Sequence, residues 1–337
     1  MKNILAIIVL TVFVFATSFA QKNNNISISE NNGKTSISIK DSRQKLDIQV
    51  KGDVTFTENE KGIQSLSRNG SISYKKNGDK LKITRESDGS LLYAINGTKK
   101  SVPDVQDEKI IAACVQTMIN AGINGKERAQ AIFKKNGLRG VFSELNRFES
   151  DYVKHIYLNS LVSNRLLADE EMISLLEKVN SDLKSDYYKA EVLLKMQKDY
   201  LKNAMVLNAY LAAVKKIDSD YYKTEVIKKS LSGSRVNDVQ FEHFMDVVSQ
   251  MKSDYYQAEI ILAVLKKSEP NEHPYSQTLA AIQNMKSSYY QAEVLGKLID
   301  KGVKDEAEWN QLIEYANKIE SSYYRAEILS KIISARP

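Results

Sequence analysis

The chain has few of the residues that most often carry chemistry. Its 337 residues include one cysteine and three histidines. A single cysteine, Cys114, excludes an intrachain disulfide framework and any metal site built from several cysteines. Three scattered histidines leave little room for metal binding or acid–base catalysis. We therefore expect no cofactor and no bound metal.

Catalytic motifs are also missing. His155, His243 and His273 do not form a His-Glu-x-x-His pair, and the sequence holds no Gly-x-Ser-x-Gly, phosphate-binding Gly-x-x-x-x-Gly-Lys, Gly-x-Gly-x-x-Gly or Cys-x-x-Cys motif. We therefore expect a protein that is not an enzyme and has no catalytic residues. The alternative is an enzyme or enzyme subunit that acts on envelope glycan or peptide through carboxylates.

Apolar runs of near-spanning length are confined to the first twenty residues, "MKNILAIIVLTVFVFATSFA". Lys2, an apolar stretch and small residues at Ser18 and Ala20 are typical of a secretory signal peptide over residues 1–20, with cleavage after Ala20. An uncleaved membrane anchor is the alternative, although its uncharged run is shorter than the roughly 20 apolar residues that a spanning helix needs. We expect a periplasmic or secreted protein with no stable membrane insertion after cleavage.

Charge is low and unevenly placed. The formal net charge is +6, and most of the excess lies in residues 21–106. This mild positive bias favours an anionic surface such as an acidic polysaccharide, whereas the simpler interpretation is an ordinary solvated surface. Without a dense basic stripe, nucleic acid is not an expected partner.

Residues 25–100 alternate between apolar and polar with a period of two, which predicts β-strands with one buried face. Asn-Gly and Asp-Gly pairs separate the strands and fit tight hairpins. We expect an antiparallel β domain over residues 21–103, whose apolar face either folds on itself or is covered by the first helices. The predicted strands are 26–29, 35–40, 45–50, 53–58, 71–76, 80–84 and 91–95.

The period changes to 3.6 near residues 101–109, which predicts linking helices over residues 104–149. The first helix carries an apolar stripe from Ile110 to Ile119 that includes Cys114. The stripe indicates a buried, inert cysteine, with a reactive thiol as the alternative. Two further helices are expected at 126–135 and 138–148, separated by Asn136-Gly137.

One phrase then recurs every 34 residues: "SDYYKAEVLLKM" from Ser185, "SDYYKTEVIKKS" from Ser219, "SDYYQAEIILAV" from Ser253, "SSYYQAEVLGKL" from Ser287 and "SSYYRAEILSKI" from Ser321. Aliphatic residues seven and eight places after each serine define the buried stripe of a first helix. A second apolar helix precedes the next serine, so each unit is a helical hairpin that must stack on its neighbours. "ESDYVKHIYLNSL" (149–161) is an earlier, atypical copy.

These patterns define the expected fold: α+β in two domains, with an N-terminal antiparallel β-sheet domain followed by an α-solenoid of about five and a half helical-hairpin repeats over residues 150–337. The repeat serine or the aspartate after it is expected to cap the helix, and the aspartate suits the macrodipole. The second tyrosine of each phrase flanks the buried stripe.

The first tyrosine, the glutamate and the following lysine are spaced four apart and share a face turned away from that stripe. The spacing predicts Glu–Lys pairs within each helix. One interpretation is helix support with tyrosine packing between units; the sharper one is a recognition surface along the stack, since tyrosine has an apolar body and a polar tip. The candidate residues are Tyr187, Glu191, Lys195, Tyr221, Glu225, Lys229, Tyr255, Glu259, Tyr289, Glu293, Lys297, Tyr323, Glu327 and Lys331.

Two further segments, "GDVTFTENEKGIQSLSRNGSISY" (52–74) and "INGKERAQAIFKKNGLRGVFSELNRFESDYVKHIYL" (123–158), together with the Ser-Asp-Tyr-Tyr units, resemble an uncharacterised bacterial extracytoplasmic module. Similar segments occur in the non-cytoplasmic part of antirepressor-type zinc membrane peptidases. The zinc motif and the membrane domain are absent here, so peptidase activity does not carry over. The resemblance implies an envelope-facing module of unknown ligand. Together with the missing catalytic motifs, it leads us to expect a non-enzymatic binding or scaffolding module of the bacterial cell envelope, whose partner is a protein or envelope polymer.

Overall fold

The computed structural model describes residues 24–31, 34–41, 46–163, 167–231, 236–268 and 275–336. The predicted signal peptide lies outside these residues, as do His273 and the loop prolines Pro270 and Pro274. The chain divides into two compact units, Met1–Asn124 and Gly125–Pro337. The boundary falls inside the expected linking segment 104–149, so its first helix belongs to the β unit and the rest to the helical unit.

Among its described residues, the first unit has an antiparallel sheet of seven strands in the order β1-β2-β3-β6-β7-β8-β9, with β4 and β5 paired separately. Every predicted strand is present there, and the short strands β5 and β9 were not predicted. The bounds are β1 Asn24–Asn31, β2 Lys34–Asp41, β3 Leu46–Lys51, β4 Val54–Phe56, β5 Ile63–Leu66, β6 Ser71–Lys76, β7 Asp79–Arg85, β8 Leu91–Ile95 and β9 Thr98–Lys100.

Helix α1 (Val105–Asn120) covers the apolar face of this sheet. Of the two arrangements expected from the sequence, the structure therefore has the one in which a first helix covers the sheet. The sheet buries residues such as Ile48, Ile72 and Ile83 completely. The helix buries its own stripe, which includes Cys114. Asp104 begins the helix by accepting from the backbone N–H groups of Gln106 and Asp107, so a capping box defines where the chain leaves the sheet.

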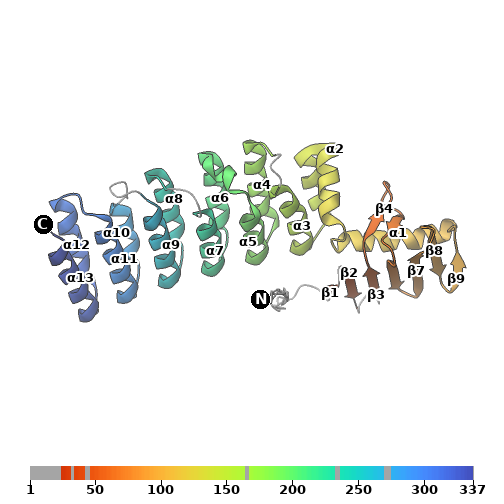
Figure 1. Cartoon of the computed structure of the whole chain (residues 1–337), viewed down its shortest axis with the longest axis horizontal. Coiled ribbons are helices and arrows are strands. Elements are labelled where there is room, and N and C mark those ends of the chain that lie inside the picture. The colour runs from red at the N-terminus through yellow and green to blue at the C-terminus, as the bar shows by residue number, and fades with distance from the viewer. Residues whose placement is uncertain are drawn as a thin grey trace, which may run out of the picture. The chain divides into compact units, whose positions relative to one another are not determined.

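The second unit is a stack of helices in two rows (Figure 1). Helix α2 opens it and is interrupted at Gly137, whose φ of 63° ends one helical segment and starts the next. One row contains α3, α5, α7, α9, α11 and α13, and the other contains α4, α6, α8, α10 and α12. This confirms the predicted helical-hairpin array.

Each helix of the first row begins directly after a repeat serine, as the phrase predicted. The bounds are α2 Gly125–Leu145, α3 Asp151–Val162, α4 Asp169–Asp182, α5 Asp186–Lys195, α6 Ala204–Lys215, α7 Asp220–Ser230, α8 Asp238–Val248, α9 Asp254–Lys267, α10 Tyr275–Gln283, α11 Ser288–Lys301, α12 Glu306–Lys318 and α13 Ser322–Ala335. A short 3-10 turn, Lys198–Lys202, precedes α6.

The expected serine caps are mostly absent. Ser219 accepts a long bond from the backbone N–H of Tyr222 at 3.4 Å, whereas the side chains at the other repeat serines make no cap bond. The aspartate after the serine instead reaches across to the next repeat. Asp220 Oδ2 accepts from the backbone N–H groups of Lys252 and Ser253, both at 2.8 Å.

The same link recurs at each aspartate-bearing repeat. We call Asp151, Asp186, Asp220 and Asp254 the junction aspartates; each accepts the N–H of the next repeat serine and of the residue before it, at 2.6–3.0 Å. Hydrogen bonds to a charged acceptor contribute about 1.5–3 kcal/mol. The recurring aspartate therefore joins one repeat to the next. The sequence had indicated a role for it only at the start of its own helix.

Candidate recognition surface and pocket

The first tyrosine of each phrase is the second residue of its helix and lies on the exposed side. Tyr187, Tyr221, Tyr255 and Tyr289 are 47%, 51%, 46% and 48% exposed. The second tyrosines, one residue further on, are only partly exposed. This order agrees with the prediction that the first tyrosine faces away from the buried stripe and the second flanks it.

The tyrosine rings form one continuous series. Within a repeat the two rings lie 4.9–5.2 Å apart between centroids. Between repeats, each first tyrosine contacts the second tyrosine of the next repeat at 5.7–6.3 Å. These are mostly edge-to-face pairs, an arrangement that is favourable for aromatic rings. We call the ten rings, Tyr187/Tyr188 to Tyr323/Tyr324, the tyrosine ladder.

The atypical first copy extends this series. Tyr152 contacts Tyr188 at 6.2 Å, in the same manner as the later junctions. Val153 takes the place of a second tyrosine and is fully buried. His155 lies against Tyr188 at 4.7 Å, so the ring series begins with an imidazole beside a tyrosine.

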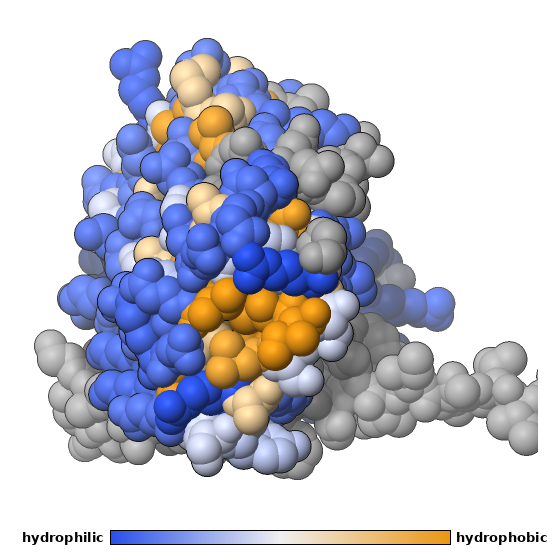
Figure 2. All heavy atoms as spheres, turned by 90° about the vertical axis from the view of Figure 1, so that its left-hand side faces the viewer, coloured by the Kyte–Doolittle hydropathy of each residue, from blue (hydrophilic) through white to orange (hydrophobic). Residues whose placement is uncertain are grey.

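The last repeat shows how much of a first tyrosine a neighbouring repeat covers. Tyr323 is 71% exposed, compared with about half for the four earlier first tyrosines. Ile333 is 77% exposed, although Leu265 at the same repeat position is fully buried. Figure 2, which looks at the end formed by α12 and α13, shows an apolar patch there. Stacking thus covers only part of the first tyrosine, and an ordered ring edge stays accessible along the stack.

Two of the exposed tyrosines, Tyr187 and Tyr289, have a raised pKa and keep their hydroxyl protons at neutral pH. Partial burial, followed by the nearby Glu191 carboxylate, raises the pKa of Tyr187 above its ordinary value. For Tyr289 the Glu293 carboxylate is the main cause of a raised pKa. A neutral phenol donates and accepts hydrogen bonds, so the ladder presents apolar ring edges with polar tips.

Part of the expected charge pairing is wrong. Lys331 contacts Asp300 of α11 at 2.8 Å instead of Glu327 in its own helix. Glu259 is followed four residues later by Ala263, and it accepts from Lys228 of the preceding repeat at 3.1 Å. Among the described residues, Glu191 and Lys195 make no ion pair with each other. The helix spacing allowed these pairs, but carboxylates and lysines from adjacent helices compete for the same partners.

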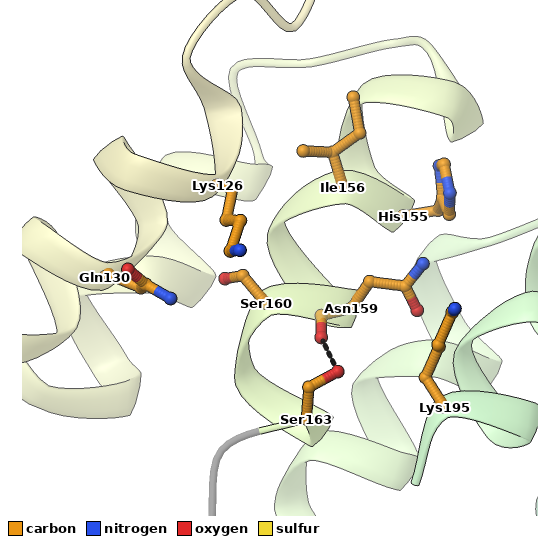
Figure 3. Close-up of a pocket in the computed structure, with 8 residues that line it drawn as sticks. All are labelled: Lys126, Gln130, His155, Ile156, Asn159, Ser160, Ser163 and Lys195. Atoms are coloured by element: carbon orange, nitrogen blue, oxygen red, sulfur yellow. Dashed lines mark hydrogen bonds between the residues drawn. The ribbon is translucent and has the colours of Figure 1, made fainter.

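A pocket of about 520 Å³ lies at the beginning of the helical unit (Figure 3). Helix α2 supplies Lys126 and Gln130, α5 supplies Lys195, and α3 supplies the middle of the lining. No sequence pattern pointed to this pocket, because its residues come from three helices and share no motif. The α3 lining residues are His155, Ile156, Asn159, Ser160 and Ser163.

Cys114 and His243 are the remaining candidates for chemistry, and neither lines the pocket. Cys114 is fully buried, and burial raises its pKa to about 12, which favours the inert thiol over the reactive alternative. His243 lies on α8, away from the pocket lining. Among the residues that the structure describes, no three His, Cys, Asp or Glu side chains are grouped to hold a metal ion.

No family model, curated protein or solved structure matches the chain.

Within the described ranges, none of the helices combines the length and apolar character required to cross a bilayer.

Proposed function

We propose that this protein is an exported, non-enzymatic binding or scaffolding module of the bacterial cell envelope. The observation that carries the proposal is the tyrosine ladder, whose rings are ordered by contacts between repeats while the first tyrosines remain about half exposed. Rigid aromatic side chains with polar tips are well suited to interfaces, because little conformational entropy is lost on binding. The regular spacing favours an extended partner, either a protein segment or an envelope polymer.

The alternative of an enzyme that acts on envelope glycan or peptide needs carboxylates brought together in a pocket. The described residues that line the pocket at α2, α3 and α5 include two lysines and no carboxylate. This supports the binding module over the enzyme. The proposed periplasmic or secreted location rests on the signal-peptide pattern of residues 1–20.

Export predicts that the mature protein begins at Gln21. Intact-mass measurement on protein purified from its native cells checks this directly. A mass that retains residues 1–20, found in the membrane fraction, would contradict the cleavage and with it the proposed location.

Binding through the ladder can be tested by affinity capture from native envelope extract. The variant Tyr187→Ala/Tyr221→Ala/Tyr255→Ala, verified as folded by circular dichroism, should lose the material that the unmodified protein retains. The matched control is Met205→Ala/Val239→Ala, which removes two exposed apolar side chains from the other helix row. Equal capture by the folded ladder variant and the control would refute the ladder as the binding surface.

A further inference from the structure

The pocket at α2, α3 and α5 combines positive charge with neutral hydrogen-bonding groups. Lys126 and Lys195 bring two ammonium groups, and none of the described lining residues is a carboxylate. The Glu191 carboxylate is near enough to His155 to oppose the lowering of its pKa, but Glu191 is not one of the lining residues. An unbalanced pair of lysines favours an anionic ligand.

Figure 3 shows the lining on two sides of α3. Lys126 and Gln130 lie with Ser160 on one side, and the Asn159 amide extends between His155 and Lys195 on the other. The two lysines therefore come from different helices and flank a central ridge. One small anion cannot occupy both sides, so this arrangement fits a ligand with two separated acidic groups.

The imidazole of His155 offers one acceptor group to a ligand. His155 Nδ1 lies 2.7 Å from the carbonyl oxygen of Tyr152, which can only accept, so Nδ1 carries the proton and Nε2 is an acceptor in the neutral ring. Burial lowers the pKa of His155, which keeps the ring neutral at neutral pH. Buried acceptors of this kind are satisfied by hydroxyl or N–H donors.

Hydroxyl and amide groups complete the lining. Ser160 and Ser163 donate to backbone carbonyl oxygens of α3, so their hydroxyl oxygens face a ligand as acceptors. The Gln130 amide adds N–H donors and an oxygen acceptor, and the Asn159 amide adds N–H donors. A ligand rich in hydroxyl groups can supply both partners to such a lining.

The volume of about 520 Å³ lies in the usual range for organic ligands and exceeds what inorganic phosphate would fill. We infer that this pocket binds an acidic saccharide with two carboxylates, each facing one lysine, and with its hydroxyls on the amide, serine and imidazole groups. This inference does not rest on the tyrosine ladder.

Isothermal titration of the full chain with digalacturonate tests the inference. Saturable binding in the millimolar range or tighter is expected. Maltose, which has a similar size and no carboxylate, should bind at least about tenfold more weakly, because charged hydrogen bonds are lost. The dipeptide Glu-Glu has two carboxylates without the saccharide hydroxyls and should also bind more weakly.

Lys126→Ala and Lys195→Ala should each weaken digalacturonate binding about tenfold, and the double variant should abolish it. Both lysines are exposed, so the fold should persist. Lys297→Ala is the matched control, because Lys297 holds the same repeat position as Lys195 and is not among the residues that line this pocket. Tyr221→Ala should leave digalacturonate binding unchanged, which separates this site from the ladder.

Three results would overturn the inference: no saturable binding of digalacturonate, equal or tighter binding of maltose, or equal losses in Lys195→Ala and Lys297→Ala. Binding of Glu-Glu as tight as that of digalacturonate, or tighter, would reject the saccharide and assign the pocket to acidic peptides.

Discussion

The four junctions built on aspartate and the last junction, built on Ser288, make the same connection with different chemistry. At the first four, one carboxylate oxygen accepts two backbone N–H groups of the next repeat. At the last, Ser288 Oγ accepts one, from Ser321, at 3.2 Å. The ring contact there, Tyr289 to Tyr324 at 5.7 Å, is as close as those at the other junctions.

The difference separates two contributions to stacking. Tyrosine rings and aliphatic residues pack at every junction, whereas the carboxylate adds a directional link at only some of them. Ring packing tolerates small rotations between repeats, but two N–H groups on one oxygen define how the next helix begins. The aspartates therefore add a directional link to the packing of rings and aliphatic side chains.

The largest expected effect comes from removing a second tyrosine at an aspartate junction. Tyr222→Ala should lower the free energy of unfolding by about 2 kcal/mol, less than for a fully buried aromatic ring because Tyr222 is partly exposed. Tyr221→Ala should cost about 1 kcal/mol, the order of one aromatic pair. Urea unfolding followed by circular dichroism measures both. Equal losses would mean that the first tyrosines serve packing as much as the second.

A smaller loss in the free energy of unfolding is expected when the aspartate link between two repeats is removed. Asp220→Ala leaves the N–H groups of Lys252 and Ser253 without their acceptor and should cost about 1.5 kcal/mol. Ser288→Ala is the matched control at the last junction and should cost less than about 0.5 kcal/mol, as for other part-exposed sites. The comparison fails if the two variants unfold at the same urea concentration.

The smallest effect is a gain in stability at the last junction. Ser288→Asp should rebuild the two-bond link, with the backbone N–H groups of Glu320 and Ser321 as donors, and raise the free energy of unfolding by about 0.5–1 kcal/mol. Urea unfolding again gives the measurement, with Ser288→Asn as the uncharged control. A stability at or below that of the unmodified protein would show that the junction aspartates are not the stronger link.

Much of the fold could be predicted from the sequence because it depends on local periodicity. The alternation of residues 25–100 and the stripes of the repeats report which face of each element is buried, so both the strands and the helix starts follow. The tyrosine positions were also predictable, since the first and second tyrosines of one helix face different directions by geometry alone.

The rest depends on contacts between residues far apart in sequence. A serine before a helix indicated a cap, yet the structure assigns the junction to an aspartate 33 residues earlier. The Glu–Lys spacing indicated a pair between Glu327 and Lys331 within one helix, yet Lys331 pairs with Asp300 of α11. Where two partners are sterically possible, only the packing distance between helices decides which one is closer.

Local sequence patterns are therefore sufficient to establish that the chain has a sheet and a repeating helical hairpin, and that two tyrosines recur on each first helix. Hydrophobic burial imposes these periods residue by residue, so they can be read without coordinates. Three features follow from tertiary contacts alone: the rings join into one ladder, aspartates link the repeats, and Lys126 and Lys195 share a pocket. Each of them depends on how separate helices approach one another, which no local period encodes.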